Sequence, residues 1–233
     1  MKHTEQIDRI SYYESLMQEA VGLLRGGDPS EQTLARLRTL TEKLETYYTG
    51  DDWKRDFADD EAGLLPKEIK RGVLSEDGLY NLLEAARDFR IEALLEQPWW
   101  VIDALPEQVP TDSPGQYFAV ERYYFAEPQL SRIKQRHIDL VLKLNCYRDV
   151  SLDGEATVNP APERIASAMR ERHVCILLDD ALLVSEPDEL CLALYHPDEA
   201  LLALTKALAV GEGLYVWQPE HQRTETERPS VNS

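Results

Sequence analysis

Positive charge is scarce in this sequence. Its 233 residues include 25 lysines and arginines against 43 aspartates and glutamates, for a formal net charge of -18 at pH 7. Such an excess of negative charge repels phosphate backbones and anionic lipid surfaces. We therefore expect no binding to nucleic acid or to membranes, and we expect any charged protein partner to be basic.

Cysteine is scarce as well. Cys146, Cys175 and Cys191 are an odd number of thiols that form no CxxC pair and have no histidine at metal-ligand spacing. Each lies in an apolar run, so we expect three buried, reduced thiols. The pattern argues against a disulfide framework, and we expect neither a metal nor another cofactor.

Long apolar runs are missing. No stretch approaches the roughly 18 consecutive apolar residues that a membrane-spanning helix needs, and residues 1–15 lack the apolar segment of a signal peptide. The motifs GxGxxG, GxSxG and HExxH are also absent. We therefore expect a cytoplasmic protein, and the absent motifs weigh against an enzyme without excluding one.

What the sequence does contain indicates an α+β fold in two domains. Hydrophobic residues make up 43% of the chain and charged residues 29%, enough to fill a core and to cover it. We expect a helical bundle or hairpin, followed by a mixed or mainly antiparallel sheet with two helices. The expected limits are 1–96 for the helical domain, 97–115 for a junction, 116–218 for the α+β domain and 219–233 for a disordered tail.

The N-terminal region predicts three amphipathic helices. Apolar residues recur at helical spacing from Gln6 to Leu24, and again between Ser30 and Gly50. A third such stripe follows Ser75. Both serines are natural N-caps, so the three helices can bury their apolar stripes against one another.

The junction is rich in proline and also apolar. Four prolines between residues 97 and 115 disfavour both helix and strand. Trp99, Trp100 and their apolar neighbours are too hydrophobic for a solvated linker. We therefore expect a rigid segment that packs between the two domains.

The C-terminal region predicts strands and two helices. Residues 116–125 and 137–147 are rich in aromatic and β-branched residues, which indicates two strands. We then expect a helix that Pro160 and Pro162 introduce and that ends near Glu171. It is followed by a three-stranded meander (HVCILL, ALLVS, ELCLALYH), a helix after Pro197 and a closing strand, GLYVWQ.

One segment, residues 47–83, carries a specific order of uncommon residues. It contains a Tyr-Tyr pair, a Trp, an acidic run, Leu-Pro and RGVLSED before a Leu-rich helix. The residues concerned are Tyr47, Tyr48, Trp53, Asp56, Asp60, Glu61, Leu65, Pro66, 71–77 and Leu82. This order resembles that of an uncharacterised bacterial domain family. The resemblance covers only the N-terminal region, and it implies no catalytic residue because the family has no known function.

The same segment contains candidate functional residues. Asp56, Asp59 and Asp60 share a face if residues 53–61 are helical, and Arg71 follows closely enough to meet them. One interpretation is structural: Arg71 neutralises the acidic face and Trp53 anchors the core. The alternative is a bound divalent cation, but the spacing does not fit an EF-hand loop.

Cysteine and histidine chemistry has little support. Cys146 has His137 before it and Asp149 after it, but the apolar alternation of 137–147 predicts an inward, structural thiol. His173 and His196 flank strands of the meander and could converge. The sequence does not decide whether they do.

Two function hypotheses follow. The first is a non-catalytic interaction protein, immunity-like or adaptor-like, whose acidic surface binds a basic protein. The alternative is a small enzyme or ligand-binding protein with a site at the domain junction, which would also use residues 145–149. Self-association through the helical domain is a third possibility. The candidate binding residues are Trp53, Asp56, Asp60, Arg71, Trp99, Trp100 and Asp103.

Overall fold

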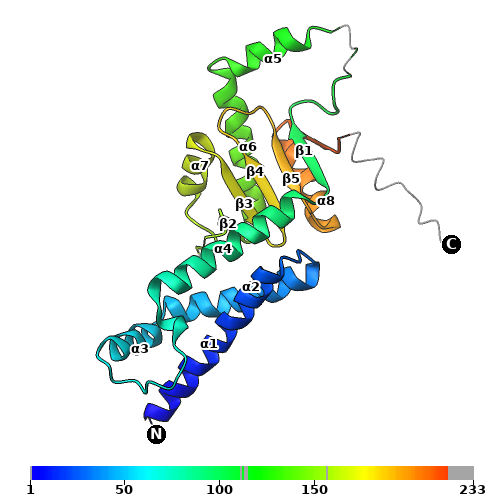
Figure 1. The fold of residues 1–233 in the computed structure, drawn as a ribbon. Helices are drawn as coiled ribbons and strands as arrows, with labels where there is room; N and C mark the ends of the chain where they lie inside the picture. Colours follow the sequence, from blue (N-terminus) through cyan, green and yellow to red (C-terminus); the bar gives the residue numbers. More distant parts are fainter. Residues whose placement is uncertain (1, 111, 113–114, 156, 220–233) are drawn as a thin grey trace, which may run out of the picture. The chain divides into compact units, whose positions relative to one another are not determined.

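The computed structural model describes residues 2–110, 112, 115–155 and 157–219. The chain divides into two compact units, Met1–Ala93 and Leu94–Ser233. Helices come first and an antiparallel sheet with further helices follows, so the predicted α+β fold is confirmed (Figure 1). The expected disorder of the tail lies outside the described residues, apart from Pro219.

The first unit consists of helices in the part of the chain that the structure describes. They are α1 (Lys2–Gly26), α2 (Glu31–Tyr48), α3 (Asp51–Glu61), the short 3-10 helix η1 (Gly72–Leu74) and α4 (Glu76–Leu95). Both predicted caps are present. The Ser30 hydroxyl accepts a hydrogen bond from Thr33 N at 3.4 Å, and the Ser75 hydroxyl accepts one from Gly78 N at 3.1 Å.

The core of this unit forms where the apolar stripes of the helices meet. Its members include Ile10 of α1, Leu40 and Leu44 of α2, and Leu79 of α4, all fully buried. Trp53 of α3 also belongs to this core. The helical periodicity of the sequence therefore identified the faces that pack together.

The second unit is built on a sheet that has six strands within the described residues. All neighbouring strands are antiparallel, in the order β2-β3-β4-β5-β1-β6. In chain order the strands are β1 (Trp99–Asp103), β2 (Val150–Leu152), β3 (Val174–Leu178), β4 (Ala181–Ser185), β5 (Leu192–Tyr195) and β6 (Tyr215–Trp217). The predicted meander β3-β4-β5 and the closing strand β6 are both present. The short strand β2 was not expected.

The segment after α4 is not the irregular junction that its prolines predict. Trp99–Asp103 forms β1, which pairs with β5 through Trp99 and Tyr195 and with β6 through Val101 and Trp217. Pro98 precedes the strand and the other prolines follow it, so none of them removes a hydrogen bond from the ladder. The expectation that strand is disfavoured here is therefore wrong.

Two predicted strands are helices. Tyr117–Phe125 forms α5 and Gln129–Asn145 forms α6. The alternation of apolar residues in 137–147 fits a helix as well, because Ile138, Val141 and Leu144 also follow helical spacing and are buried. With α7 (Pro162–Glu171) and α8 (Glu199–Gly211), both predicted, the described part of this unit has four helices and not two.

The core of the second unit lies between helices α6, α7 and α8 and one face of the sheet. Val174, Ile176 and Leu178 alternate along β3 and contribute to it, together with Ile165 of α7 and Leu201 of α8. Among the helices of the described chain, none is long and apolar enough to span a membrane.

Candidate functional site

Asp56 is the centre of a buried cluster in the first unit. α3 places its fully buried carboxylate against α1 and α2. Arg9 donates from Nε to Oδ2 at 2.9 Å and from Nη2 to Oδ1 at 2.6 Å. The Tyr47 hydroxyl donates to Oδ2 at 2.7 Å and the Gln6 amide to Oδ1 at 3.0 Å. Each carboxylate oxygen therefore accepts two hydrogen bonds.

These contacts keep Asp56 ionised. Burial raises the pKa of this carboxyl, but the hydrogen bonds from Arg9, Tyr47 and Gln6 outweigh burial and hold the pKa below its ordinary value. Burial and the neighbouring Asp56 raise the pKa of Tyr47. An anion whose acceptors are all filled by protein donors has little capacity left for a metal ion. The cluster connects three helices.

The other predicted residues of this segment also have protein partners. Arg71 pairs with Asp60, and both side chains are partly exposed. The Trp53 indole donates to the carbonyl of Val73 at 3.0 Å. The contacts of Trp53, Asp56, Asp60 and Arg71 are explained without a ligand, and a binding role for them stays a prediction.

Sequence reasoning missed the contribution of α1 to this cluster. Arg9, and not Arg71, neutralises Asp56, and it lies 47 positions earlier in the chain. Glu14 of α1 is buried as well, and its Oε2 accepts a hydrogen bond from Val73 N at 2.8 Å. The sequence did contain one signal for this contribution, because Glu14 lies on an otherwise apolar face of α1.

The predicted residues of the junction lie in β1. Successive side chains of a strand point to opposite faces, so Trp99 and Trp100 do not share a surface. Trp99 stacks on Tyr195 with ring centroids 5.9 Å apart. Asp103 accepts a hydrogen bond from Leu105 N at 3.2 Å, and burial raises the pKa of its carboxyl. The seven candidate residues are thus divided between the two units.

The cysteines differ from expectation. Cys146 follows α6 and is exposed, so the prediction of an inward thiol is wrong; Cys175 is buried and Cys191 is partly buried. The possible base His137 is fully buried in α6. Within the described residues, no group of three or more histidine, cysteine or acidic side chains is arranged to hold a metal ion.

His173 approaches a thiol, but not the one considered from sequence. Its Nε2 lies 3.4 Å from the Sγ of Cys175, and its Nδ1 contacts the Glu186 carboxylate. A thiol, an imidazole and an orienting carboxylate are the groups of a nucleophilic site. Burial, however, raises the pKa of Cys175 to about 11, so the thiol stays protonated near neutral pH.

Helix α5 carries an exposed apolar surface. No residue of this helix, which is described throughout, is buried. We call the exposed side chains Tyr117, Phe118, Val120, Tyr123, Tyr124 and Phe125 the α5 aromatic surface. Phe118 is 76% exposed and Tyr123 58%. Figure 1 shows α5 beyond the end of α6 and clear of the strands. Clusters of large exposed apolar side chains are a feature of interaction sites in folded proteins.

The sequence on either side of α5 contains more acidic than basic residues. Residues 104–128 contain four acidic side chains, Glu107, Asp112, Glu121 and Glu127, and one basic side chain, Arg122. Within the helix, the Tyr117 hydroxyl donates to Glu121 Oε1 at 2.8 Å. An apolar centre with an acidic surround is suited to a partner whose apolar groove has a basic rim.

The first unit is a small helical domain organised around a buried carboxylate. Residues 10–95 match the family model described as Domain of unknown function (DUF4298), so the N-terminal region of this chain carries that domain. The match confirms the resemblance to an uncharacterised family, and it ends before α5. The comparisons found no matching curated protein and no matching solved structure.

Proposed function

We propose that this is a bacterial, cytoplasmic, non-catalytic interaction protein that binds a basic protein partner through the α5 aromatic surface. The observation that carries the proposal is an aromatic helix in which no residue is buried. Six large apolar side chains of α5 contact water, and none of them is fully buried in the core of its own unit. Their burial by a partner supplies the free energy for binding.

The chemistry of α5 suits a short helix that enters a groove. Tyrosine and phenylalanine bury a large area, and their few rotatable bonds limit the conformational entropy lost on binding. Aromatic residues are also frequent among the side chains that dominate interface energies. We expect Phe118 and Tyr123, the two most exposed members, to be the main contacts.

The charge of the chain supports a basic partner. The net charge is -18, and α5 lies in an acidic part of the sequence. Complementary charge accelerates association and disfavours acidic competitors. An immunity-like or adaptor-like protein would use this combination of charge and apolar contact.

Affinity capture from native cells tests the proposal. The wild-type protein is compared with Phe118→Ala/Tyr123→Ala and with the control Tyr147→Ala, which removes a tyrosine that is 66% exposed outside α5. We expect the wild type and the control to retain a stoichiometric basic protein at low salt, and the double variant to lose it. A partner that the double variant retains, or a partner that is acidic, contradicts the proposal.

Sedimentation equilibrium of the purified protein gives a second test. A dimer that Phe118→Ala/Tyr123→Ala converts to a monomer would show that the α5 aromatic surface contacts a second copy of the chain. In that case the partner would be a second copy of the chain and not a basic protein, and the proposal would be wrong. We expect the isolated protein and the double variant to have the same mass in solution.

A further inference from the structure

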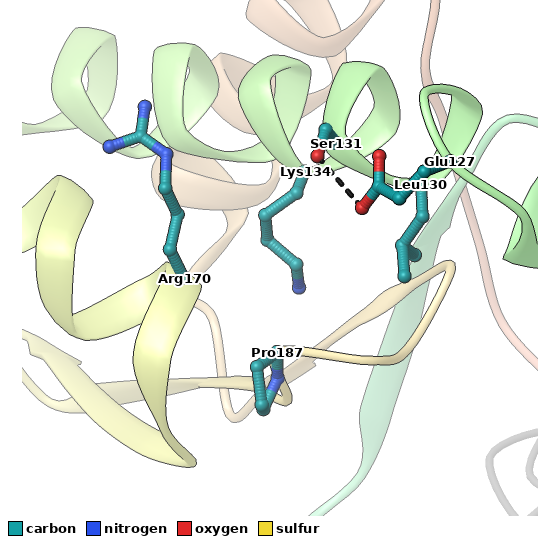
Figure 2. A pocket seen from close by; sticks show the side chains of 6 residues that line it. All are labelled: Glu127, Leu130, Ser131, Lys134, Arg170 and Pro187. Atoms are coloured by element: carbon teal, nitrogen blue, oxygen red, sulfur yellow. Dashed lines mark hydrogen bonds between the residues drawn. The ribbon is translucent and has the colours of Figure 1, made fainter.

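The second unit contains a small cavity that is separate from the α5 aromatic surface. It has a volume of about 140 Å³ and lies between α6, α7 and the turn that follows β4 (Figure 2). The lining residues are Glu127, Leu130, Ser131, Lys134, Arg170 and Pro187. This volume suits a ligand of a few non-hydrogen atoms and is too small for a nucleotide.

Lys134 is an unusual residue to find in this position. Only 3% of it is exposed, and its ammonium donates to the Ser185 hydroxyl at 3.4 Å and to the carbonyl of Glu186. Both acceptors are uncharged. Among the described residues, no carboxylate lies within 4 Å of Nζ. Burial lowers the pKa of Lys134 and outweighs the effect of Asp188, Glu186 and Glu189, which attract the ammonium from farther away. The ammonium has three donors, so one remains available.

Arg170 lines the same cavity from α7. Its Nη2 donates to Gln135 Oε1 at 2.6 Å, again an uncharged acceptor. The described chain places no carboxylate within ion-pair distance of it. Arg170 is exposed, so it does not require a counter-ion; among the other arginines of this unit, Arg148 pairs with Asp179 and Arg164 with Glu155. In Figure 2 the Lys134 side chain extends from α6 toward Pro187, whereas the Arg170 guanidinium is directed toward α6.

We propose that this cavity binds a small oxyanion, a single carboxylate or phosphate group, at the Lys134 ammonium, with Arg170 adding positive charge at one wall of the cavity. Burying a cation without a counter-ion is unfavourable, and a bound anion offsets that cost. The ammonium supplies a point charge and a hydrogen-bond donor, and the Arg170 guanidinium supplies a second, more distant positive charge.

The remaining residues of the cavity restrict the ligand further. Glu127 accepts a hydrogen bond from the Ser131 hydroxyl at 2.9 Å and brings a negative charge to one side. That charge disfavours polyanions and favours a ligand whose far end donates a hydrogen bond. Leu130 and Pro187 offer an apolar wall for a short carbon skeleton. A small hydroxy or amino carboxylate has this chemistry.

Calorimetric titration of the whole protein with inorganic phosphate and with acetate, at constant ionic strength, tests the site. We expect saturable binding of at least one probe. Lys134→Met should weaken it roughly 10- to 100-fold, because it removes a charged hydrogen-bond donor. Arg170→Gln should weaken it less, because it removes a more distant charge. Lys143→Met and Arg164→Gln are matched controls on α6 and α7, and both should bind like the wild type. Binding of acetate without phosphate identifies a carboxylate site, and the reverse identifies a phosphate site.

The melting temperature without anion separates a binding role of Lys134 from a folding role. Lys134→Met replaces a buried charge that has no ion-pair partner with an apolar side chain of similar size. If Lys134 serves ligand binding and not folding, we expect this change to raise the melting temperature. A lower melting temperature would assign Lys134 to folding and contradict the proposal. The proposal is also overturned if neither probe saturates, or if Arg170→Gln binds as tightly as Arg164→Gln.

Discussion

Asp56 accepts hydrogen bonds from two helices while lying on a third. Removing its charge leaves the partly buried Arg9 guanidinium with only a longer contact to Asp52, at 3.9 Å. We expect Asp56→Asn to lower the free energy of unfolding of the first unit by about 2 to 4 kcal/mol. Urea denaturation followed by tryptophan fluorescence measures the change, because Trp53 reports on the same helix.

Arg71→Ala is the matched comparison. Arg71 and Asp60 are both partly exposed, so solvent screens their pair and the expected loss is about 1 kcal/mol or less. An equal loss for Asp56→Asn and Arg71→Ala would contradict the central role of Asp56. A smaller loss for Asp56→Asn would do so more strongly.

His137 makes the stability of the second unit depend on pH. It is fully buried, neither ring nitrogen has a hydrogen-bond partner within the described chain, and burial lowers its pKa to about 3. Between about pH 6.5 and 3 the unfolded chain binds a proton at this residue and the folded chain does not. Stability is therefore lost as the pH falls through this window, by up to about 1.4 kcal/mol per pH unit.

His137→Leu should remove this pH dependence. Relative to the wild type, we expect the variant to gain about 2 to 3 kcal/mol of stability when the pH falls from 7 to about 4.5. His196→Asn is the control: it changes an exposed histidine and keeps a residue that tolerates the positive φ of 52° at this position. Parallel stability profiles for the wild type and His137→Leu would disprove the account.

The burial of these residues could be predicted only in part. The helical spacing of Asp56 and Asp60 was visible in the sequence, and so was the cap at Ser75. The pairing of Asp56 with Arg9 was not visible, because tertiary packing brings α1 and α3 together and no local pattern encodes the contact. The burial of His137 was missed because the apolar alternation of residues 137–147 was interpreted as a strand, whereas this segment is part of helix α6.

Helices α5 and α6 show why short apolar segments are ambiguous. Residues 117–125 contain six aromatic or β-branched side chains, which favour strand, yet α5 is a helix outside the core. In α6, good helix formers such as Gln129, Gln135 and Arg136 precede the ambiguous stretch and extend the same helix. A pattern read from residue 137 onward omits this upstream context.

Because α5 has no buried residue, we expect its helical form to matter for binding more than for stability. Arg122→Pro should break α5, since proline in a helix interior removes a hydrogen bond and clashes with the preceding turn. We expect the free energy of unfolding to change by less than about 1 kcal/mol, while the basic partner is lost. Chemical denaturation and affinity capture measure the two effects. A large loss of stability would show that α5 supports the fold.

For the whole chain, the sequence predicted the fold class better than the topology. The change from helices to mixed structure and the meander β3-β4-β5 were visible as a change of hydrophobic period. The position of β1 between β5 and β6 was not, because strand order depends on contacts between segments about 90 residues apart or more. No pattern within a single segment records such pairing.

The net charge predicts the kinetics of partner binding. Long-range attraction between the acidic chain and a basic protein is screened by salt, since the Debye length falls from about 30 Å at 0.01 M to about 8 Å at 0.15 M. We expect the association rate constant to fall at least about tenfold over this range. The dissociation rate constant, set by the apolar α5 contact, should change much less. Surface plasmon resonance with the captured partner measures both. An association rate that salt does not affect would contradict the basic nature of the partner.

The central claim is that the aromatic side chains of α5 serve binding and not folding. Differential scanning calorimetry of Phe118→Ala/Tyr123→Ala, with no partner present, tests this most directly. The account predicts a melting temperature equal to that of the wild type or slightly higher, because both side chains contact water in the free protein. A clear fall in the melting temperature would show that α5 packs into the folded protein, and the claim would be wrong.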